Sequence, residues 1–274
     1  MGIFADRFGK EVVVVGAGTM GSGIAETFVG HGWAVKLVDP STETLERATE
    51  RIAAAGGSGS LITACDVAEL GGARFVIETV PENPGLKTAV LSAVERLLKP
   101  ELLCTNTSSL SVGELQSVLE HPDRFIGLHF FQPVPRTKLI EIVTTSRTSP
   151  ETLQFARACA EELGRKPIVV ADSPGFATSR LGIAIGLEAI RMVEEDIASA
   201  SDIDDGMILG YQHGVGPLRM TDMVGLDTRL AIGEHLAATL GPRFEPPALL
   251  RKMVDQGKLG RKSGQGFFSW PEEK

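Results

Sequence analysis

A histidine and a glutamate twelve residues apart, His129 and Glu141, are the strongest candidates for chemistry in this sequence. Residues 125–129 and 138–143 are apolar runs that predict two buried strands, and a proline-containing loop separates them. If the chain turns back at this loop, the imidazole and the carboxylate can meet on neighbouring strands. A carboxylate in that place orients a general base and stabilises its protonated form. The alternative is a core histidine satisfied by a backbone carbonyl and a glutamate on a solvated face.

A glycine-rich loop with the spacing G-x-G-x-x-G lies near the start of the chain. It follows a β-branched run at residues 11–15 and precedes a helical pattern. The first glycine permits a tight turn, the second lets a pyrophosphate approach the backbone, and the third lets helix and strand pack closely. Free N–H groups at the start of the helix would bind the phosphates. A purely structural turn is the alternative. The six residues of this predicted cofactor loop are Gly16, Ala17, Gly18, Thr19, Met20 and Gly21.

An acid follows the second predicted strand, residues 34–38, and this acid is Asp39, 18 residues after Gly21. At this position in a nucleotide-binding unit a carboxylate holds the ribose hydroxyls of adenosine. It also repels a 2′-phosphate, and the next residue is Pro40 instead of an arginine. NAD is therefore the expected cofactor, in preference to NADP, and no metal is expected.

A polar cluster at residues 106–109 follows the predicted strand at 102–105. The carboxyl ends of strands are where ligands bind in open α/β sheets, so Asn106 and Ser108 are candidate site residues. The alternative is that serines here, Ser109 or Ser111, only cap the helix predicted near 111–119.

Apolar runs alternate with helical patterns through residue 171, and only helical periodicity follows. The expected fold class is therefore α/β: a mostly parallel sheet with helices on both faces, then an all-α domain. The domains are expected at residues 1–173 and 174–274. The Gly/Ser segment 56–60 is expected to be a flexible turn before a short apolar run at 61–65. The remaining predicted strands are residues 73–80 and 166–171, and the remaining predicted helices are 42–55 (capped by Ser41), 85–98, 150–163, 178–198, 203–209, 218–240 in pieces, and 247–255.

The composition is that of a globular enzyme, with 43% hydrophobic and 23% charged residues. A net charge of −8 without a basic run argues against nucleic acid as a partner. The three cysteines are dispersed, and Cys104 and Cys159 are expected in the core, so a reducing, cytoplasmic compartment is predicted. No secretory signal is expected at residues 1–10, and no run approaches the ~20 apolar residues that span a membrane.

The chain resembles the 3-hydroxyacyl-CoA dehydrogenase family, most closely the short bacterial 3-hydroxybutyryl-CoA dehydrogenases. The resemblance runs in the same order over nearly the whole chain. It implies a Rossmann-type NAD-binding domain, then a helical substrate domain that supplies most of a homodimer interface, and a role in fatty acid metabolism. The matching stretches are VVVVGAGTMGSGIA, TNTSSLS, RFIGLHFFQPVP with KLIEIV, DSPGF, VGLDTRLAIGEHL and LLRKMVDQGKLGRKSGQGFF.

The resemblance also implies roles for single residues. His129 would be the general base for the 3-hydroxyl group, Glu141 its orienting partner, and Ser108 a hydrogen-bond partner of the reacting oxygen. Four further residues would lie along the cofactor: Glu82, Lys87, Gln132 where the family usually has asparagine, and Lys262 from the tail.

Two departures from the family pattern bear on the substrate. Ser179 stands where the family has a catalytic asparagine, and it offers one hydroxyl instead of an amide. The protruding helical hairpin that grips the CoA nucleotide in the family is expected to be truncated here to the turn at 56–60.

Three hypotheses follow. The first is an NAD-dependent dehydrogenase that interconverts a 3-hydroxyacyl thioester, such as 3-hydroxybutyryl-CoA, and the 3-ketoacyl thioester. The second keeps this chemistry but acts on a carrier-protein-bound or free 3-hydroxy acid. The third is a non-catalytic NAD-binding relative. Retention of His129, Glu141 and Ser108 argues against the third.

Overall fold

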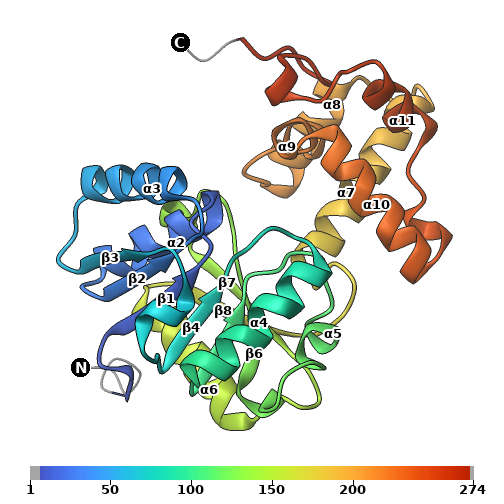
Figure 1. Ribbon diagram of the computed structural model, residues 1–274. Coiled ribbons are helices and arrows are strands. Elements are labelled where there is room, and N and C mark those ends of the chain that lie inside the picture. The colour runs from blue at the N-terminus through green and yellow to red at the C-terminus, as the bar shows by residue number, and fades with distance from the viewer. Residues whose placement is uncertain (1–6, 272–274) are drawn as a thin grey trace. The chain divides into compact units, whose positions relative to one another are not determined.

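A computed structural model describes residues 7–271 of the protein and shows two compact units (Figure 1), Met1–Ser173 and Pro174–Lys274. Residues 1–6, part of the stretch predicted to lack a secretory signal, lie outside the described residues. Within residues 7–271, no helix has the length and apolar character needed to cross a membrane.

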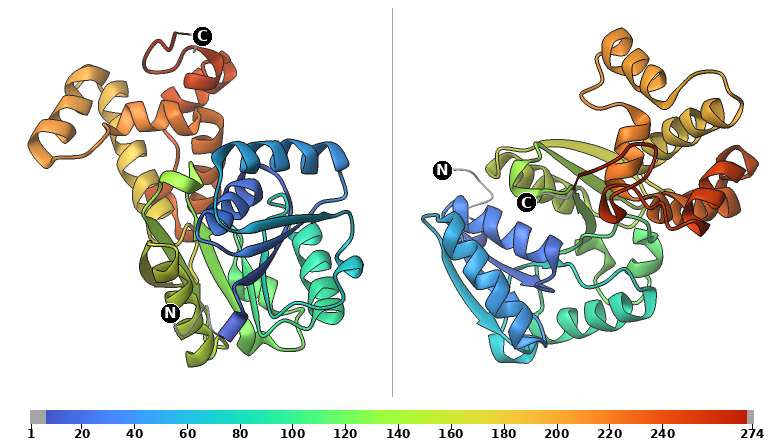
Figure 2. Two further views of the ribbon diagram at one scale, coloured as in Figure 1. Left: turned by 90° about the vertical axis from the view of Figure 1, so that its left-hand side faces the viewer. Right: turned by 90° about the horizontal axis from the view of Figure 1, so that it is seen from above.

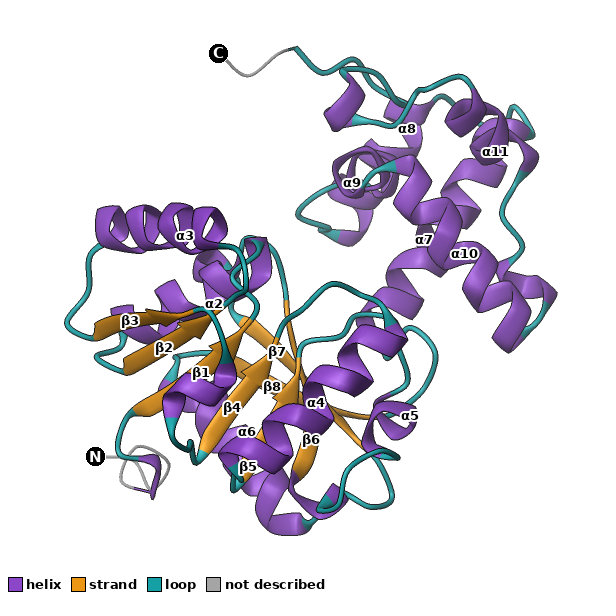
Figure 3. Ribbon diagram, viewed as in Figure 1, coloured by secondary structure: helices purple, strands orange, loops and turns teal. Residues whose placement is uncertain are grey.

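The described part of the first unit is built on one sheet of eight strands in the order β3-β2-β1-β4-β5-β6-β7-β8 (Figure 3). Every neighbouring pair is parallel except β6 and β7, which run antiparallel. The mostly parallel sheet and the helical second unit confirm the predicted fold class. The strands are β1 Glu11–Val15, β2 Ala34–Val38, β3 Ser60–Ala64, β4 Phe75–Glu78, β5 Leu102–Thr105, β6 Phe125–Phe130, β7 Leu139–Thr144 and β8 Lys166–Ala171.

Helices cover both faces of this sheet. Helices α2 (Thr19–Gly30), α3 (Thr42–Ala55) and α6 (Pro150–Glu162) share one hydrophobic core with alternate strand residues such as Val14 and Ile77. Helix α4 (Pro84–Leu98) crosses the strands on the other face, in front of the sheet in Figure 3, and contacts α5 (Val112–Gln116). The central strands β1, β4, β5 and β6 are thus buried almost throughout, which explains their nearly continuous apolar runs.

Strand β3 is an element that the sequence analysis missed. Among the strands of residues 7–271 it pairs with β2 alone, at the edge of the sheet, and Ile62 in its middle is 60% exposed. Within the preceding turn Gly59 lies close to other backbone, because a side chain there would overlap the Trp33 carbonyl oxygen. Helix α3, capped by Ser41 as predicted, is joined to β3 by this turn alone (Figure 2).

Several predicted elements were longer than those in the structure. The predicted strand 73–80 is only Phe75–Glu78, because the Glu78 carboxylate accepts the Val80 N–H and turns the chain. The predicted helix 111–119 is only Val112–Gln116. The predicted core location of Cys104 and Cys159 is confirmed: both are buried, and desolvation raises the pKa of both thiols.

The regular elements of the second unit up to residue 271 are helices, and two isolated β-bridges, Gly260–Gln265 and Gln265–Ser269, lie near its end. The predicted helix 178–198 ends at Glu194, because Asp196 adopts a left-handed conformation and Ser199 caps the next helix. The predicted helix 203–209 is the end of that next helix followed by a π-helical turn at Gly206–Gly210. The helices are α7 Thr178–Glu194, α8 Ala200–Asp205, α9 Pro217–Val224, α10 Leu226–Leu240 and α11 Ala248–Asp255.

Candidate active site

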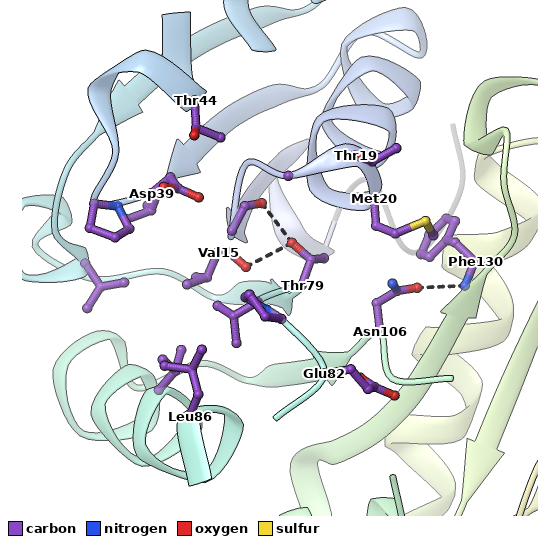
Figure 4. A pocket seen from close by; sticks show the side chains of 18 of the residues that line it. Val15, Thr19, Met20, Asp39, Thr44, Thr79, Glu82, Leu86, Asn106 and Phe130 are labelled. Atoms are coloured by element: carbon purple, nitrogen blue, oxygen red, sulfur yellow. Dashed lines mark hydrogen bonds between the residues drawn. The ribbon is translucent and has the colours of Figure 1, made fainter. Parts of the chain in front are cut away.

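A cavity of about 950 Å³ opens at the carboxyl ends of six strands of the first unit, β1 to β6. Strand order changes direction between β1 and β4, and in open α/β sheets ligands bind at such a switch point. Figure 4 shows the wall, with Asp39 and Thr44 at one end and Asn106, Glu82 and Phe130 at the other.

The glycine loop forms one wall of this cavity, and glycine is required at each of its three positions for a different reason. Gly16 has a φ of 103°, and a side chain there would meet Thr79 at 2.9 Å. Gly21, in the first turn of α2, has no room either, because its side chain would overlap the Gly16 carbonyl oxygen. At Gly18 a side chain would meet no atom of the protein within 4 Å. Glycine at this position therefore keeps space open in the cavity.

A threonine on the neighbouring strand fixes the loop. The Thr79 hydroxyl lies 3.0 Å from the Val15 carbonyl oxygen and 2.8 Å from that of Gly16, as the dashed lines in Figure 4 show. Thr79 also donates its N–H to Val15 at 2.7 Å. These bonds tie the end of β4 to the turn that opens the cofactor loop.

Asp39 is held by two backbone N–H groups at the end of β2. Its Oδ2 accepts from Ala17 at 2.9 Å and its Oδ1 from Ser41 at 2.9 Å. Each carboxylate oxygen has a second lone pair, and the residue lines the cavity. Asp39 can therefore accept hydrogen bonds from a ribose.

The residues present fit NAD. Helix α2 begins at the cavity, its N-cap Gly18 offers no side-chain cap, and its first turn carries no acidic residue. The N–H groups and positive dipole end of α2 are thus available to a pyrophosphate beside the open space at Gly18. Asp39 would hold the adenosine ribose.

The predicted pair of His129 and Glu141 is formed. The two residues lie directly opposite each other in the antiparallel register of β6 and β7, and Nδ1 of His129 lies 3.0 Å from Oε2 of Glu141. Glu141 is fully buried, whereas His129 is 6% exposed and lines the cavity. The Phe131 ring packs against the imidazole at 4.4 Å between centroids. A carboxylate acceptor places the hydrogen on Nδ1, which leaves Nε2 as the basic nitrogen.

Glu82 organises the polar loop that follows β5. Its Oε1 accepts from the Thr107 hydroxyl at 2.7 Å and from the backbone N–H groups of Ser108 and Ser109 at 2.9 Å each. Partial burial opposes ionisation of Glu82, but these hydrogen bonds and the nearby Lys87 ammonium outweigh it, so the pKa of Glu82 lies below its ordinary value. The carboxylate fixes Ser108 at the edge of the cavity.

Asn106, Ser108 and Gln132 line the same cavity as His129. The side-chain oxygen of Asn106 accepts the Phe130 N–H at 2.8 Å, which leaves its amide hydrogens as donors. Ser111 does not line the cavity; it caps α5, as the alternative interpretation of this cluster held.

Lys87 lies behind the cavity wall. Its side chain is fully buried, and its Nζ lies 2.8 Å from Oε1 of Glu78 and 3.6 Å from Oε2 of Glu82. Glu78 was not predicted as a site residue, and its side chain is also fully buried. The available signal was an acidic residue at the end of an otherwise apolar strand.

Ser179 and Lys262 belong to the second unit. Ser179 lies in the first turn of α7. Lys262 pairs with Asp227 at 2.6 Å; partial desolvation opposes ionisation of Asp227, but the Lys262 hydrogen bond and charge outweigh it and lower the pKa of that carboxyl. The buried Asp222 binds the backbone N–H groups of Phe267 and Phe268 and so holds the tail that carries Lys262.

The fold and the cavity define a class of protein, the NAD-dependent dehydrogenases. Residues 11–173 match the NAD binding domain of 3-hydroxyacyl-CoA dehydrogenase, and residues 175–270 match its C-terminal domain. The chain belongs to the 3-hydroxyacyl-CoA dehydrogenase family.

Relatives match over nearly the full length. A probable 3-hydroxybutyryl-CoA dehydrogenase of Bacillus subtilis is 38% identical over 282 aligned residues, which cover 96% of this chain and 98% of that protein. The structure of the (S)-3-hydroxybutyryl-CoA dehydrogenase PaaH1 of Ralstonia eutropha superposes with a TM-score of 0.90 at 35% identity, covering 96% and 99%. A diketoreductase that acts on dicarbonyl compounds superposes with a TM-score of 0.81 at 27% identity, covering 95% and 98%.

Proposed function

We propose that the protein interconverts a 3-hydroxyacyl thioester, such as 3-hydroxybutyryl-CoA, and the 3-ketoacyl thioester, with His129 as the general base. The reaction class follows from the family. The assignment of His129 rests on one observation, its hydrogen bond to the buried Glu141 in the cavity that also contains the glycine loop.

Bound NAD supplies the acceptor for the hydride that leaves C3 of the substrate. Nε2 of His129 takes the proton of the 3-hydroxyl group, and the C–O bond becomes a carbonyl. The imidazolium that forms is stabilised by Glu141, which also keeps the ring oriented. In the reduction, the same nitrogen returns the proton to the oxygen.

The remaining roles are proposed from the position of each residue and from the family pattern. Ser108 donates its hydroxyl to the reacting oxygen, Asn106 and Gln132 contact the nicotinamide end of the cofactor, and Glu82 with Lys87 fixes the loop beside it. In the second unit, Ser179 and Lys262 are proposed as site residues from the family pattern alone.

A second candidate function has the same chemistry on a carrier-protein-bound or free 3-hydroxy acid. The direct turn between α3 and β3 favours it, because this turn has no helical hairpin to contact a CoA nucleotide. The similarity to a diketoreductase favours it too, since that protein acts on dicarbonyl compounds.

Oxidation of NADH with acetoacetyl-CoA, compared with acetoacetyl-pantetheine, separates the two functions. We expect rapid turnover of the CoA ester and a pantetheine ester that is at least about tenfold worse in kcat/KM, which corresponds to roughly 1.4 kcal/mol of binding to the nucleotide. Equal rates on both esters would favour a carrier-protein substrate. No turnover of either would direct the test to free 3-hydroxy acids, and NADH binding without any turnover would establish a non-catalytic relative.

We also propose that the protein is a homodimer. Helices α7 and α9 contact each other and expose apolar side chains, among them Leu181 at 63%, Ile185 at 40% and Val224 at 43%. Exposed apolar groups that gather on neighbouring helices mark interaction surfaces, and a self-complementary dimer is the commonest assembly.

Sedimentation velocity should show a species of about twice the 29.2 kDa chain. Leu181→Glu should shift this species toward the monomer without loss of helix content, because the Leu181 side chain is exposed in the single chain. A wild-type monomer at micromolar concentration would contradict the dimer.

A cytoplasmic location and a role in fatty acid metabolism complete the proposal. The location rests on the dispersed free cysteines, and the metabolic role rests on the acyl-CoA substrates in the names of the relatives. Cell fractionation with an antibody tests the location, and growth of a deletion strain on short-chain fatty acids tests the role.

A further inference from the structure

Glu78 is a buried carboxylate beside the active-site cavity that the proposed mechanism does not use. It ends β4, its side chain is fully buried, and both of its oxygens are occupied by donors. Oε1 accepts from the Val80 N–H at 2.7 Å and from the Lys87 ammonium at 2.8 Å. Oε2 accepts from the Thr105 hydroxyl at 2.6 Å.

Through Lys87, Glu78 is linked to the loop that carries Ser108. The buried ammonium contacts Glu78 at 2.8 Å and Glu82 at 3.6 Å, so it lies between two carboxylates and closer to the buried one. Glu82 in turn holds the backbone of Ser108 and Ser109. Displacement of the Lys87 ammonium would change the position of Glu82, and with it that of the loop of Ser108 and Ser109, here called the serine loop.

Glu78 also holds the end of β5 directly. The Thr105 hydroxyl binds its side chain, and the N–H of Asn106 donates to its carbonyl oxygen at 2.8 Å. Asn106 then accepts the N–H of Phe130, the residue after His129. One residue is therefore connected to the serine loop and to the strand end that carries the histidine.

A buried ion pair is a poor source of stability, because desolvation of the two charges offsets their attraction. Its advantage is fixed geometry, since each bond made by a buried charge is costly to break.

We propose that Glu78 is a positioning residue of the dehydrogenase. It acts through Lys87 and Thr105 to hold the loop of Asn106 and Ser108 in its position relative to His129. It touches neither substrate nor cofactor. The inference rests on the proposed function, because it assumes that Ser108 and His129 carry the reaction.

Glu78→Gln is the decisive variant, because it keeps the volume of the side chain but replaces one acceptor oxygen with a donor amide. The donors on the two sides of Glu78 cannot then both be satisfied. We expect kcat with acetoacetyl-CoA to fall about 10- to 100-fold, because small misplacements of catalytic groups reduce rates by factors of this size. NADH affinity, measured by fluorescence titration, should weaken much less, because the glycine loop and Asp39 are bonded independently of Glu78.

Assays run well below the melting temperature of each variant separate positioning from stability. A lower Tm with kcat unchanged would overturn the inference and leave Glu78 a purely structural residue. NADH affinity falling in step with kcat would also overturn it, because the whole domain would then be disturbed. A wild-type protein without turnover would instead contradict the proposed function.

Two further variants serve as an independent test and as a control. Thr105→Val removes one donor to Glu78 at nearly constant volume and keeps the experiment decisive if Glu78→Gln does not fold. It should lower kcat in the same direction by a smaller factor, and an unchanged kcat would count against the inference. Glu101→Gln is the matched control, because Glu101 pairs with Arg74 just before β5 begins, at the end of that strand remote from the cavity, and it should leave kcat unchanged.

Discussion

Replacement of His129 by glutamine should reduce turnover about 10²- to 10⁴-fold, the usual contribution of a positioned general base, and leave NADH binding intact. Glutamine is similar in size and can still bond to Glu141, but it cannot take a proton from the substrate. Steady-state rates with acetoacetyl-CoA and fluorescence titration with NADH measure the two effects separately. His121→Gln is the matched control, because His121 is exposed and lies before β6 begins.

Near-normal turnover in the His129→Gln variant would refute the role of His129, and so would an equal loss of turnover in His121→Gln.

Gly18→Ala should weaken NADH binding and Gly21→Ala should lower the Tm, although the two glycines belong to one motif. Gly18 has a φ of −61°, which alanine adopts freely, and a side chain there meets no protein atom within 4 Å. The fold should therefore keep its Tm. The new methyl group would occupy space that the structure leaves open for the pyrophosphate, so NADH affinity should fall at least about tenfold, or roughly 1.4 kcal/mol.

In Gly21→Ala the new methyl group overlaps the Gly16 carbonyl oxygen and approaches the Thr79 hydroxyl to 2.6 Å. Helix α2 must move away from the loop, and overpacking of this kind costs about 1–3 kcal/mol of stability. Thermal unfolding without NADH should show a clear fall in Tm for Gly21→Ala alone. Gly30→Ala, at the end of the same helix where a side chain meets nothing within 4 Å, is the control. A Gly18→Ala variant with unchanged NADH affinity would contradict the assignment of the pyrophosphate site.

Local patterns in the sequence determined most of the fold and the location of the site. Buried parallel strands leave continuous apolar runs, so seven of the eight strands within residues 7–271 were predicted. Ser41 indicated the start of α3 because a capping side chain acts on a neighbour three residues away. The glycine spacing, Asp39 and the facing positions of His129 and Glu141 could be predicted for the same reason: each depends on a turn or on adjacent strands.

Contacts between distant segments were decided only by the tertiary structure. Strand β3 was not predicted: the sequence shows a short apolar run at residues 61–65, but Ala64 is the one buried residue of β3. Glu82 binds a loop 25 to 27 residues away, and Glu78 binds Thr105 at a separation of 27. Nothing in the local sequence distinguishes such a carboxylate from a solvated one, because its partners are brought to it by strand order. The burial of Lys87 between Glu78 and Glu82 likewise depends on how α4 packs across the sheet, which the order of the strands determines.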